Sequence, residues 1–362
     1  MHLKFLFIAA AACVSASSTA QASPPAAGKA IVAAPAKIAF DKADAAKAVS
    51  DLATALEENF VFPEAGRAYA AKLRSNLAAG TYSSFPDAAA FADKVTADLQ
   101  AIHKDGHLRL RPVTAEQRSG HQAPNGGPPD KSAVAKSGWL ADGVAYIDFR
   151  GFPGNDATVA DVRKFLDGHR EAKTLIIDAR HNGGGGLAEM NLVFAEIFAE
   201  PTTLVVMDIR QAVEEKHGTP FADTDPLLRK VKGPATIIRR EHFAVPAAKQ
   251  GGLRHAKVYL LTSKNTFSAA EHLSLSLKRT RRATLVGEAT GGGAHFGGMA
   301  PMGESYAAFI PVGRTFDPDT GKSWEGVGVA PDVAVPADKA LDEALRLAGV
   351  KATAKVALSA IR

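Results

Sequence analysis

Residues 174–186 read TLIIDARHNGGGG, in which a short polar segment separates an apolar run from four consecutive glycines. The first five residues, Thr174–Asp178, have the length and composition of a strand that is buried on both faces. A helix is expected to follow at about 187–198. The same succession recurs at 257–261, where a buried strand precedes a helix at about 268–278. Further elements are expected at Val144–Phe149, 156–170 and 284–286. Apolar strands that alternate with helices predict an α/β core.

The residues before this core predict a small helical domain over 41–108. Val49, Leu52 and Leu56 recur at helical spacing and share one face. Pro63 is placed to begin a second helix and Asp87 a third. We expect a linker at 23–40, a strand and flexible hinge loop at 109–137, the α/β core at 138–346 and a C-terminal tail at 347–362.

The N-terminus has the pattern of a secretory signal peptide. A positive start at 1–4, an apolar run at 5–12 and small residues around a cleavage site at 20–22 predict removal of residues 1–22. The protein is therefore expected to be exported, either to the periplasm or out of the cell. No run is long enough to span a bilayer. Cys13 is the only cysteine, and we do not expect a lipid anchor there because the preceding residues lack the usual leucine.

Composition and spacing argue against several other classes of protein. The 362 residues carry a net charge of +5, with no basic block, so a nucleic-acid partner is not expected. His103 and His107 have the spacing of a zinc-binding helix, but Lys104 stands where glutamate is needed and Gly106 breaks the helix. We expect no metal and no cofactor.

Ser268 has two interpretations. It follows an apolar strand at the first turn of a helix, where free N–H groups and the helix dipole favour negative charge, which suits a nucleophile. Alternatively, it is a helix N-cap, with Glu271 three residues later completing a capping box.

A serine nucleophile needs a base, and His107 is the candidate. It lies at a helix-to-strand junction, although a lone histidine is more often a polar surface group. The glycines after Asn182 would let backbone N–H groups approach an oxyanion or a phosphate.

Four sequence blocks together resemble the carboxy-terminal processing serine peptidases of family 41. The match is to the branch without a PDZ domain, similar to the tricorn protease core and to modules of interphotoreceptor retinoid-binding protein. The blocks are 99–110 with Asp105-Gly106-His107, 175–185, 258–290 with Ser268, and 324–332. The resemblance implies a ββα-superhelix core, related to crotonase and Clp protease, behind a helical N-terminal domain.

The resemblance also implies the site. Ser268 is the nucleophile, and the N–H groups of Ala269 and Gly184, or alternatively Gly185, form the oxyanion hole. Many relatives use a Ser–Lys dyad, but the matching position here is Gly293. The tricorn branch uses a histidine and a glutamate instead, which match His107 and Glu325. The relay serine of that branch is replaced by Gly106, so a contact between Glu325 and His107 would be direct, through water, or absent.

These expectations define a serine peptidase that acts on peptides or unfolded proteins through an acyl-enzyme. His295 is the alternative base. A base with an ordinary pKa near 6.5 predicts activity that falls below about pH 6. The competing hypothesis is a non-catalytic module that binds a hydrophobic ligand, as retinoid-binding-protein modules do.

Overall fold

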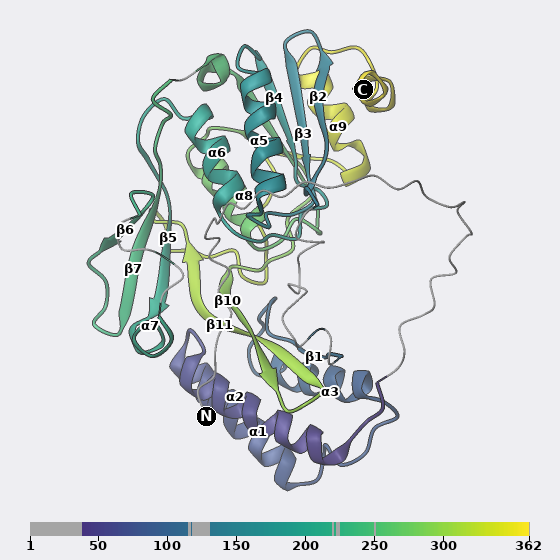
Figure 1. The fold of residues 1–362 in the computed structure, drawn as a ribbon, viewed down its shortest axis with the longest axis vertical. Helices are drawn as coiled ribbons and strands as arrows, with labels where there is room; N and C mark the ends of the chain where they lie inside the picture. Colours follow the sequence, from purple (N-terminus) through teal and green to yellow (C-terminus); the bar gives the residue numbers. More distant parts are fainter. Residues whose placement is uncertain are drawn as a thin grey trace, which may run out of the picture.

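The computed structural model describes residues 38–114, 117, 131–218, 221, 225–249 and 251–361. The predicted signal peptide at 1–22, Cys13 and most of the linker at 23–40 lie outside these residues, as does much of the expected hinge loop. Two six-stranded sheets organise the described chain (Figure 1). No helix in this part of the chain is long and apolar enough to cross a membrane.

The first sheet has the strand order β12-β9-β8-β4-β3-β2. All neighbours are parallel except β2, which pairs antiparallel with β3. The bounds are β2 Val134–Ala141, β3 Val144–Phe149, β4 Thr174–Asp178, β8 Lys257–Thr262, β9 Thr284–Gly287 and β12 Val333–Ala334. The α/β core predicted from the apolar strands is confirmed, and β2 extends it into the region expected to be a hinge loop.

Alternate residues of β4 enter different cores, which explains its uninterrupted apolar sequence. Leu175 and Ile177 pack with three helices on one face, whereas Ile176 packs with two helices on the other. The first face is covered by α5 (Asp156–Gly168), α6 (Ala188–Ile197) and α8 (Ala269–Arg279), and the second by α9 (Ala340–Leu347) and α10 (Ala354–Ala360). The segment expected to be a C-terminal tail thus contains a packed helix, α10.

The second sheet is antiparallel, and the sequence analysis did not predict it. Its order is β1-β11-β5-β7-β6, with β10 also paired to β11. The bounds are β1 Leu110–Pro112, β5 Thr202–Arg210, β6 Leu228–Val231, β7 Ile237–Ala244, β10 His295–Met302 and β11 Tyr306–Phe316, with a short helix α7 (Gln211–His217) after β5. In Figure 1, β10 and β11 connect the upper α/β layer to the lower helices.

The N-terminal helices form where the sequence predicts them. They are α1 (Lys42–Asn59), α2 (Pro63–Ala78) and α3 (Ala88–Gln100). Asp41 and Asp87 cap α1 and α3 through side-chain oxygens, as N-cap aspartates do. These helices share one hydrophobic core with β1, β10 and β11, so they do not bury their apolar faces alone. The connection from α3 to β1, which carries His107, consequently lies between the helices and both sheets.

Candidate active site

Ser268 lies in the loop between β8 and α8 and is the N-cap of the helix, with φ 57° and ψ −120°. Among the described residues, only Ser268 and Arg281 combine a side chain with a positive φ. Such a backbone costs about 1–3 kcal/mol and clusters at functional sites. The predicted capping box with Glu271 is present, so the cap interpretation is confirmed. An ordinary N-cap adopts the extended conformation, however, so capping does not explain the strained turn, which fits a nucleophile as well. The same combination of strand, strained serine and helix presents the nucleophile of other hydrolases.

Glu271 is fully buried and ties this turn to a neighbouring glycine loop. Its carboxylate accepts hydrogen bonds from the N–H groups of Ser268 (2.8 Å), Gly292 (2.6 Å) and Gly293 (2.7 Å), and from the hydroxyl of Thr290 (2.6 Å). Burial raises the pKa of Glu271 above its usual range, although these four donors oppose the rise. The sequence identifies its contact with Ser268 but not the three contacts with the loop.

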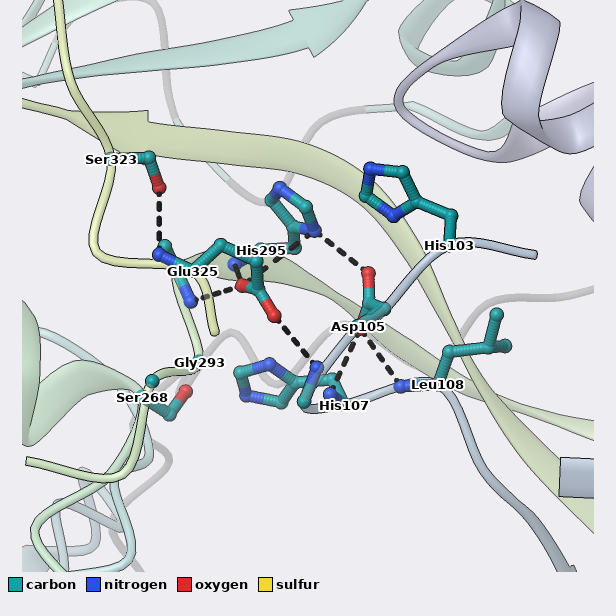
Figure 2. A network of polar contacts seen from close by, with 12 residues as sticks. His103, Asp105, His107, Leu108, Ser268, Gly293, His295, Ser323 and Glu325 are labelled. Carbon is teal, nitrogen blue, oxygen red and sulfur yellow. Dashed lines mark hydrogen bonds and ion pairs between the residues drawn. The ribbon is translucent and has the colours of Figure 1, made fainter. Parts of the chain in front are cut away.

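The ring of His107 is held by aromatic neighbours. Its centroid lies 4.6 Å from that of Phe267 and 4.9 Å from that of Phe309. Figure 2 shows the imidazole directed toward the Ser268 side chain. No hydrogen bond joins the two side chains, and His107 Nδ1 is buried without a hydrogen-bond partner. The structure therefore places the predicted base and the predicted nucleophile near one another without a direct hydrogen bond, a geometry that is common in active sites without substrate.

The surroundings of His107 lower its pKa to about 4. Loss of hydration is the largest cause, because it disfavours the charged imidazolium. The carboxylate of Asp105 opposes this effect, whereas His295, Arg109 and Arg111 add to it. The ordinary value near 6.5, expected from the sequence, does not take this environment into account. His107 is therefore neutral, as a general base has to be, well below pH 6.

Glu325 contacts the backbone beside the base rather than the base itself. One carboxylate oxygen accepts a hydrogen bond from the Gly106 N–H (2.6 Å), and the other accepts from Ala294 (2.6 Å) and His295 (3.1 Å). Figure 2 shows no bond from Glu325 to the His107 ring. Of the three possibilities that the sequence left open, a direct contact between the two side chains is therefore not the one in the structure.

His295, the alternative base, is engaged elsewhere. Its Nδ1 donates to Asp105 Oδ2 over 2.7 Å, and its ring packs edge-on against Phe60 and Phe62. Only 3% of its surface is exposed. The sequence analysis did not assign a role to Asp105, although it lies two residues before His107.

The predicted oxyanion donors lie beside Ser268. Because β4 and β8 are parallel neighbours, the loops that follow them leave the same sheet edge. A Cβ on Gly184 would stand 2.7 Å from the Ser268 Cβ, so only glycine fits. The Gly184 N–H, however, donates to Asn182 Oδ1 (2.9 Å). Gly185 pairs with Phe152 in an isolated β-bridge. The Gly184 carbonyl accepts the Phe152 N–H, and the Gly186 N–H donates to the Phe152 carbonyl, so the Gly185 N–H takes no part in the bridge.

An open cleft of about 520 Å³ borders this site. Gly106 and Gly292 line it, together with the cations Lys104, Arg109 and Arg111 and the acids Asp93 and Asp105. All three cations are exposed, and within the described chain none forms a salt bridge. Cations thus outnumber acids in this cleft.

Asp105, His295 and Glu325 are the only described group of at least three side chains with metal-ligand spacing, with ligand atoms within 4.8 Å of one another. Each of their carboxylate oxygens already accepts a hydrogen bond from an N–H group. The donor set therefore suits a hydrogen-bonded network better than it suits an ion.

Comparisons with known proteins agree with this architecture. The model of peptidase family S41 matches residues 143–335, more than half of the chain, and the model for the N-terminal domain of peptidase S41 in eukaryotic IRBP matches residues 27–137. A candidate peptidase from Parabacteroides merdae is similar at 17% identity and a TM-score of 0.52, over 88% of this chain and 96% of that one. A lipoprotein from Streptococcus agalactiae is similar at 14% identity and a TM-score of 0.51, over 88% and 98%. At these identities the structures establish the fold alone.

Proposed function

The chain belongs to peptidase family S41, and on this basis we propose that it is an exported serine-type peptidase that cleaves peptides or unfolded proteins through an acyl-enzyme on Ser268. One observation carries the proposal: a serine in a strained turn at a helix N-terminus faces a histidine that burial keeps neutral. The export part rests on the signal-like sequence of residues 1–22.

The proposed reaction is acyl transfer in two stages. As the Ser268 oxygen attacks the scissile carbonyl, His107 accepts the hydroxyl proton. His107 then gives this proton to the leaving amine, and the C–N bond breaks to leave an ester on Ser268. Water then attacks the ester carbonyl while His107 takes one of its protons. His107 returns that proton to the Ser268 oxygen as the ester C–O bond breaks, and the product leaves with its new carboxyl group. Ser268 and His107 therefore end in the states in which they began.

Two backbone N–H groups stabilise the oxyanion in this proposal. The Ala269 N–H, at the first position of α8, has no acceptor within the helix. The second donor is Gly184 if the Asn182 side chain releases it, or Gly185, whose N–H is not used in its backbone bridge. Each such donor typically contributes about 3–4 kcal/mol to transition-state stabilisation.

Glu325 acts on the backbone in this proposal. By accepting the Gly106 N–H, it fixes the turn from which His107 projects. In other serine hydrolase triads, a carboxylate orients the histidine ring. In this proposal, the rings of Phe267 and Phe309, which both contact the His107 imidazole, take that role.

The charge of the cleft favours a peptidase over a hydrophobic-ligand carrier. Retention of an apolar ligand calls for a pocket lined mostly by apolar side chains. The cleft beside the His107 turn is instead open and carries Lys104, Arg109 and Arg111. Peptides, with their polar backbones and terminal carboxylates, suit this surface better.

Hydrolysis of casein and of a mixed peptide library tests the proposal. The wild-type protein is expected to cleave, and Ser268→Ala and His107→Ala are each expected to lose activity by about 10⁴-fold or more. Ser359→Ala, which removes an exposed serine near the C-terminus, serves as the matched control and retains full activity. If Ser268→Ala cleaves as well as wild type does, Ser268 is not the nucleophile. If no form cleaves, a screen for hydrophobic ligands becomes the next experiment.

A further inference from the structure

The backbone N–H groups of residues 106–108, around the base, donate hydrogen bonds to two carboxylates that are shielded from solvent. Gly106 donates to Glu325 Oε1 (2.6 Å), and His107 and Leu108 both donate to Asp105 Oδ1 (2.9 Å each). The turn that carries the imidazole is thus fixed at every amide from 106 to 108 (Figure 2). Its position depends on where these two carboxylates are.

The two carboxylates come from distant parts of the chain and meet at one side chain. Asp105 follows α3, whereas Glu325 follows β11, and His295 Nδ1 lies 2.7 Å from Asp105 and 3.6 Å from Glu325. Figure 2 shows the His295 ring between them. Since Asp105 is fully buried and Glu325 nearly so, their negative charges would repel one another strongly without an intervening donor.

His295 itself is rigidly placed. It begins β10, and its backbone N–H donates to Glu325 Oε2 while its ring packs against Phe60 and Phe62. Burial tends to raise the pKa of Asp105, but the hydrogen bond that it accepts from His295 keeps that pKa below its usual value. The network therefore favours the ionised form of Asp105 and fixes its position relative to Glu325.

We propose that His295 is a positioning residue for the base, because its Nδ1–H donates to Asp105 while its backbone N–H donates to Glu325. His295 thereby links the two carboxylates and sets the place of the His107 ring relative to Ser268. The inference rests on the proposed function, in which His107 is the base. His295 takes no proton from the nucleophile, which separates this role from that of an alternative base.

Two substitutions of His295 in the full chain separate its hydrogen bond from its bulk. In His295→Asn the side-chain amide retains a donor close to the position of Nδ1, whereas His295→Ala removes the donor. His295→Ala is expected to lower kcat about 100-fold with KM changed by no more than about twofold, because the base is misplaced while the cleft is intact. The kcat of His295→Asn is expected to be at least about tenfold higher than that of His295→Ala. His255→Ala is the matched control, since it removes an exposed imidazole from the turn before β8, outside this network, and leaves kcat unchanged.

The titration of His107 gives a second readout that a purely structural role would not change. Loss of hydration has the largest effect on the pKa of His107, Asp105 raises it and His295 lowers it, together with Arg109 and Arg111. Both arginines are intact in the variants, so removing His295 takes away one of the effects that lower the pKa of His107 and leaves the others in place. The His107 resonances, followed by NMR, are expected to titrate at a higher pH in both His295 variants and at the wild-type pH in His255→Ala.

The outcomes are distinct for the two proposals. Equal kcat values for His295→Ala and His295→Asn, or a loss confined to KM, would overturn the positioning role. The NMR titration needs no substrate, so it decides the inference even if the protein cleaves nothing: a His107 pKa that is unchanged in His295→Ala contradicts the network, and an upward shift supports it. Failure of every form to hydrolyse peptides, with the shift present, rejects the peptidase proposal alone.

Discussion

Gly293 lies directly against the imidazole of His107. A Cβ at position 293 would stand 2.7 Å from Cε1 of that ring and 2.3 Å from Cζ of Phe267. By the resemblance to family 41, position 293 is expected to correspond to the lysine of the Ser–Lys dyads in other members. A side chain there and the His107 ring would occupy the same space. A lysine at position 293 and the observed position of the His107 ring therefore exclude each other.

Gly293→Ala is expected to lower kcat about 100-fold, because the added methyl group displaces the His107 and Phe267 rings. Steady-state kinetics with a peptide substrate measures the effect. Gly168→Ala, at the end of α5, meets nothing within 4 Å and is the matched control. Activity of Gly293→Ala within about twofold of wild type would show that the ring position is not critical.

The acid limb of kcat/KM is expected near pH 4. His107 acts as a base only when unprotonated, and its pKa is lowered to about 4, so activity persists as the pH falls through 6 and is lost as it passes through about 4. The profile should be measured over short times at each pH, with folding followed in parallel. An acid limb at pH 6–6.5 would indicate either a different base or a hydrated His107.

Glu325→Gln is expected to reduce kcat about 10- to 100-fold, less than Ser268→Ala does. Glutamine keeps one carbonyl oxygen for the Gly106 N–H, but its NH₂ group then faces the N–H groups of Ala294 and His295. Asp338→Asn, an exposed acid next to α9, controls for the loss of charge. A loss as large as that of Ser268→Ala would instead place Glu325 in direct contact with the reacting groups.

A buried histidine pair predicts destabilisation in acid. His242 Nδ1 lies 2.8 Å from His272 Nε2, and burial lowers the pKa of His272 to about 3 and that of His242 well below its ordinary value. The unfolded chain binds these protons near pH 6.5 and the folded chain does not. The free energy of unfolding should therefore fall as the pH drops below about 6.5, by up to about 1.4 kcal/mol per pH unit for each histidine.

Urea unfolding at pH 7 and pH 5 measures this dependence, and His242→Gln is expected to weaken it. Equal stability of the wild-type protein at the two pH values would contradict the account. His272 lies in α8, one turn after Ser268, and only 4% of its surface is exposed.

The parallel sheet and the N-terminal helices were predictable because their signals are local. The apolar run of Thr174–Asp178 identifies a strand buried on both faces, and Asp41 and Asp87 mark helix starts by their capping chemistry. The second sheet lacks such signals. Its strand β10, for example, contains Gly297, Gly298 and Pro301, which are typical of loops, and it forms because β11 supplies the hydrogen-bonding partner.

Some residues of the candidate site could likewise be predicted from local sequence, and others could not. Ser268 and His107 were identifiable from their places at element junctions, and the resemblance to family 41 added Glu325 and the oxyanion donors. The bridge from His295 to Asp105 spans 190 residues. No spacing rule connects such positions, so only the fold shows the contact on which the proposed positioning role of His295 rests.

Covalent labelling of the serine tests the central claim most directly. The wild-type protein, treated with a fluorophosphonate and digested for mass spectrometry, is expected to carry a single adduct on Ser268. His107→Ala should label at least about 100-fold more slowly, because the base that activates the hydroxyl is gone. An adduct on another residue, or equal labelling rates in wild type and His107→Ala, would contradict the assignment of Ser268 and His107 as nucleophile and base.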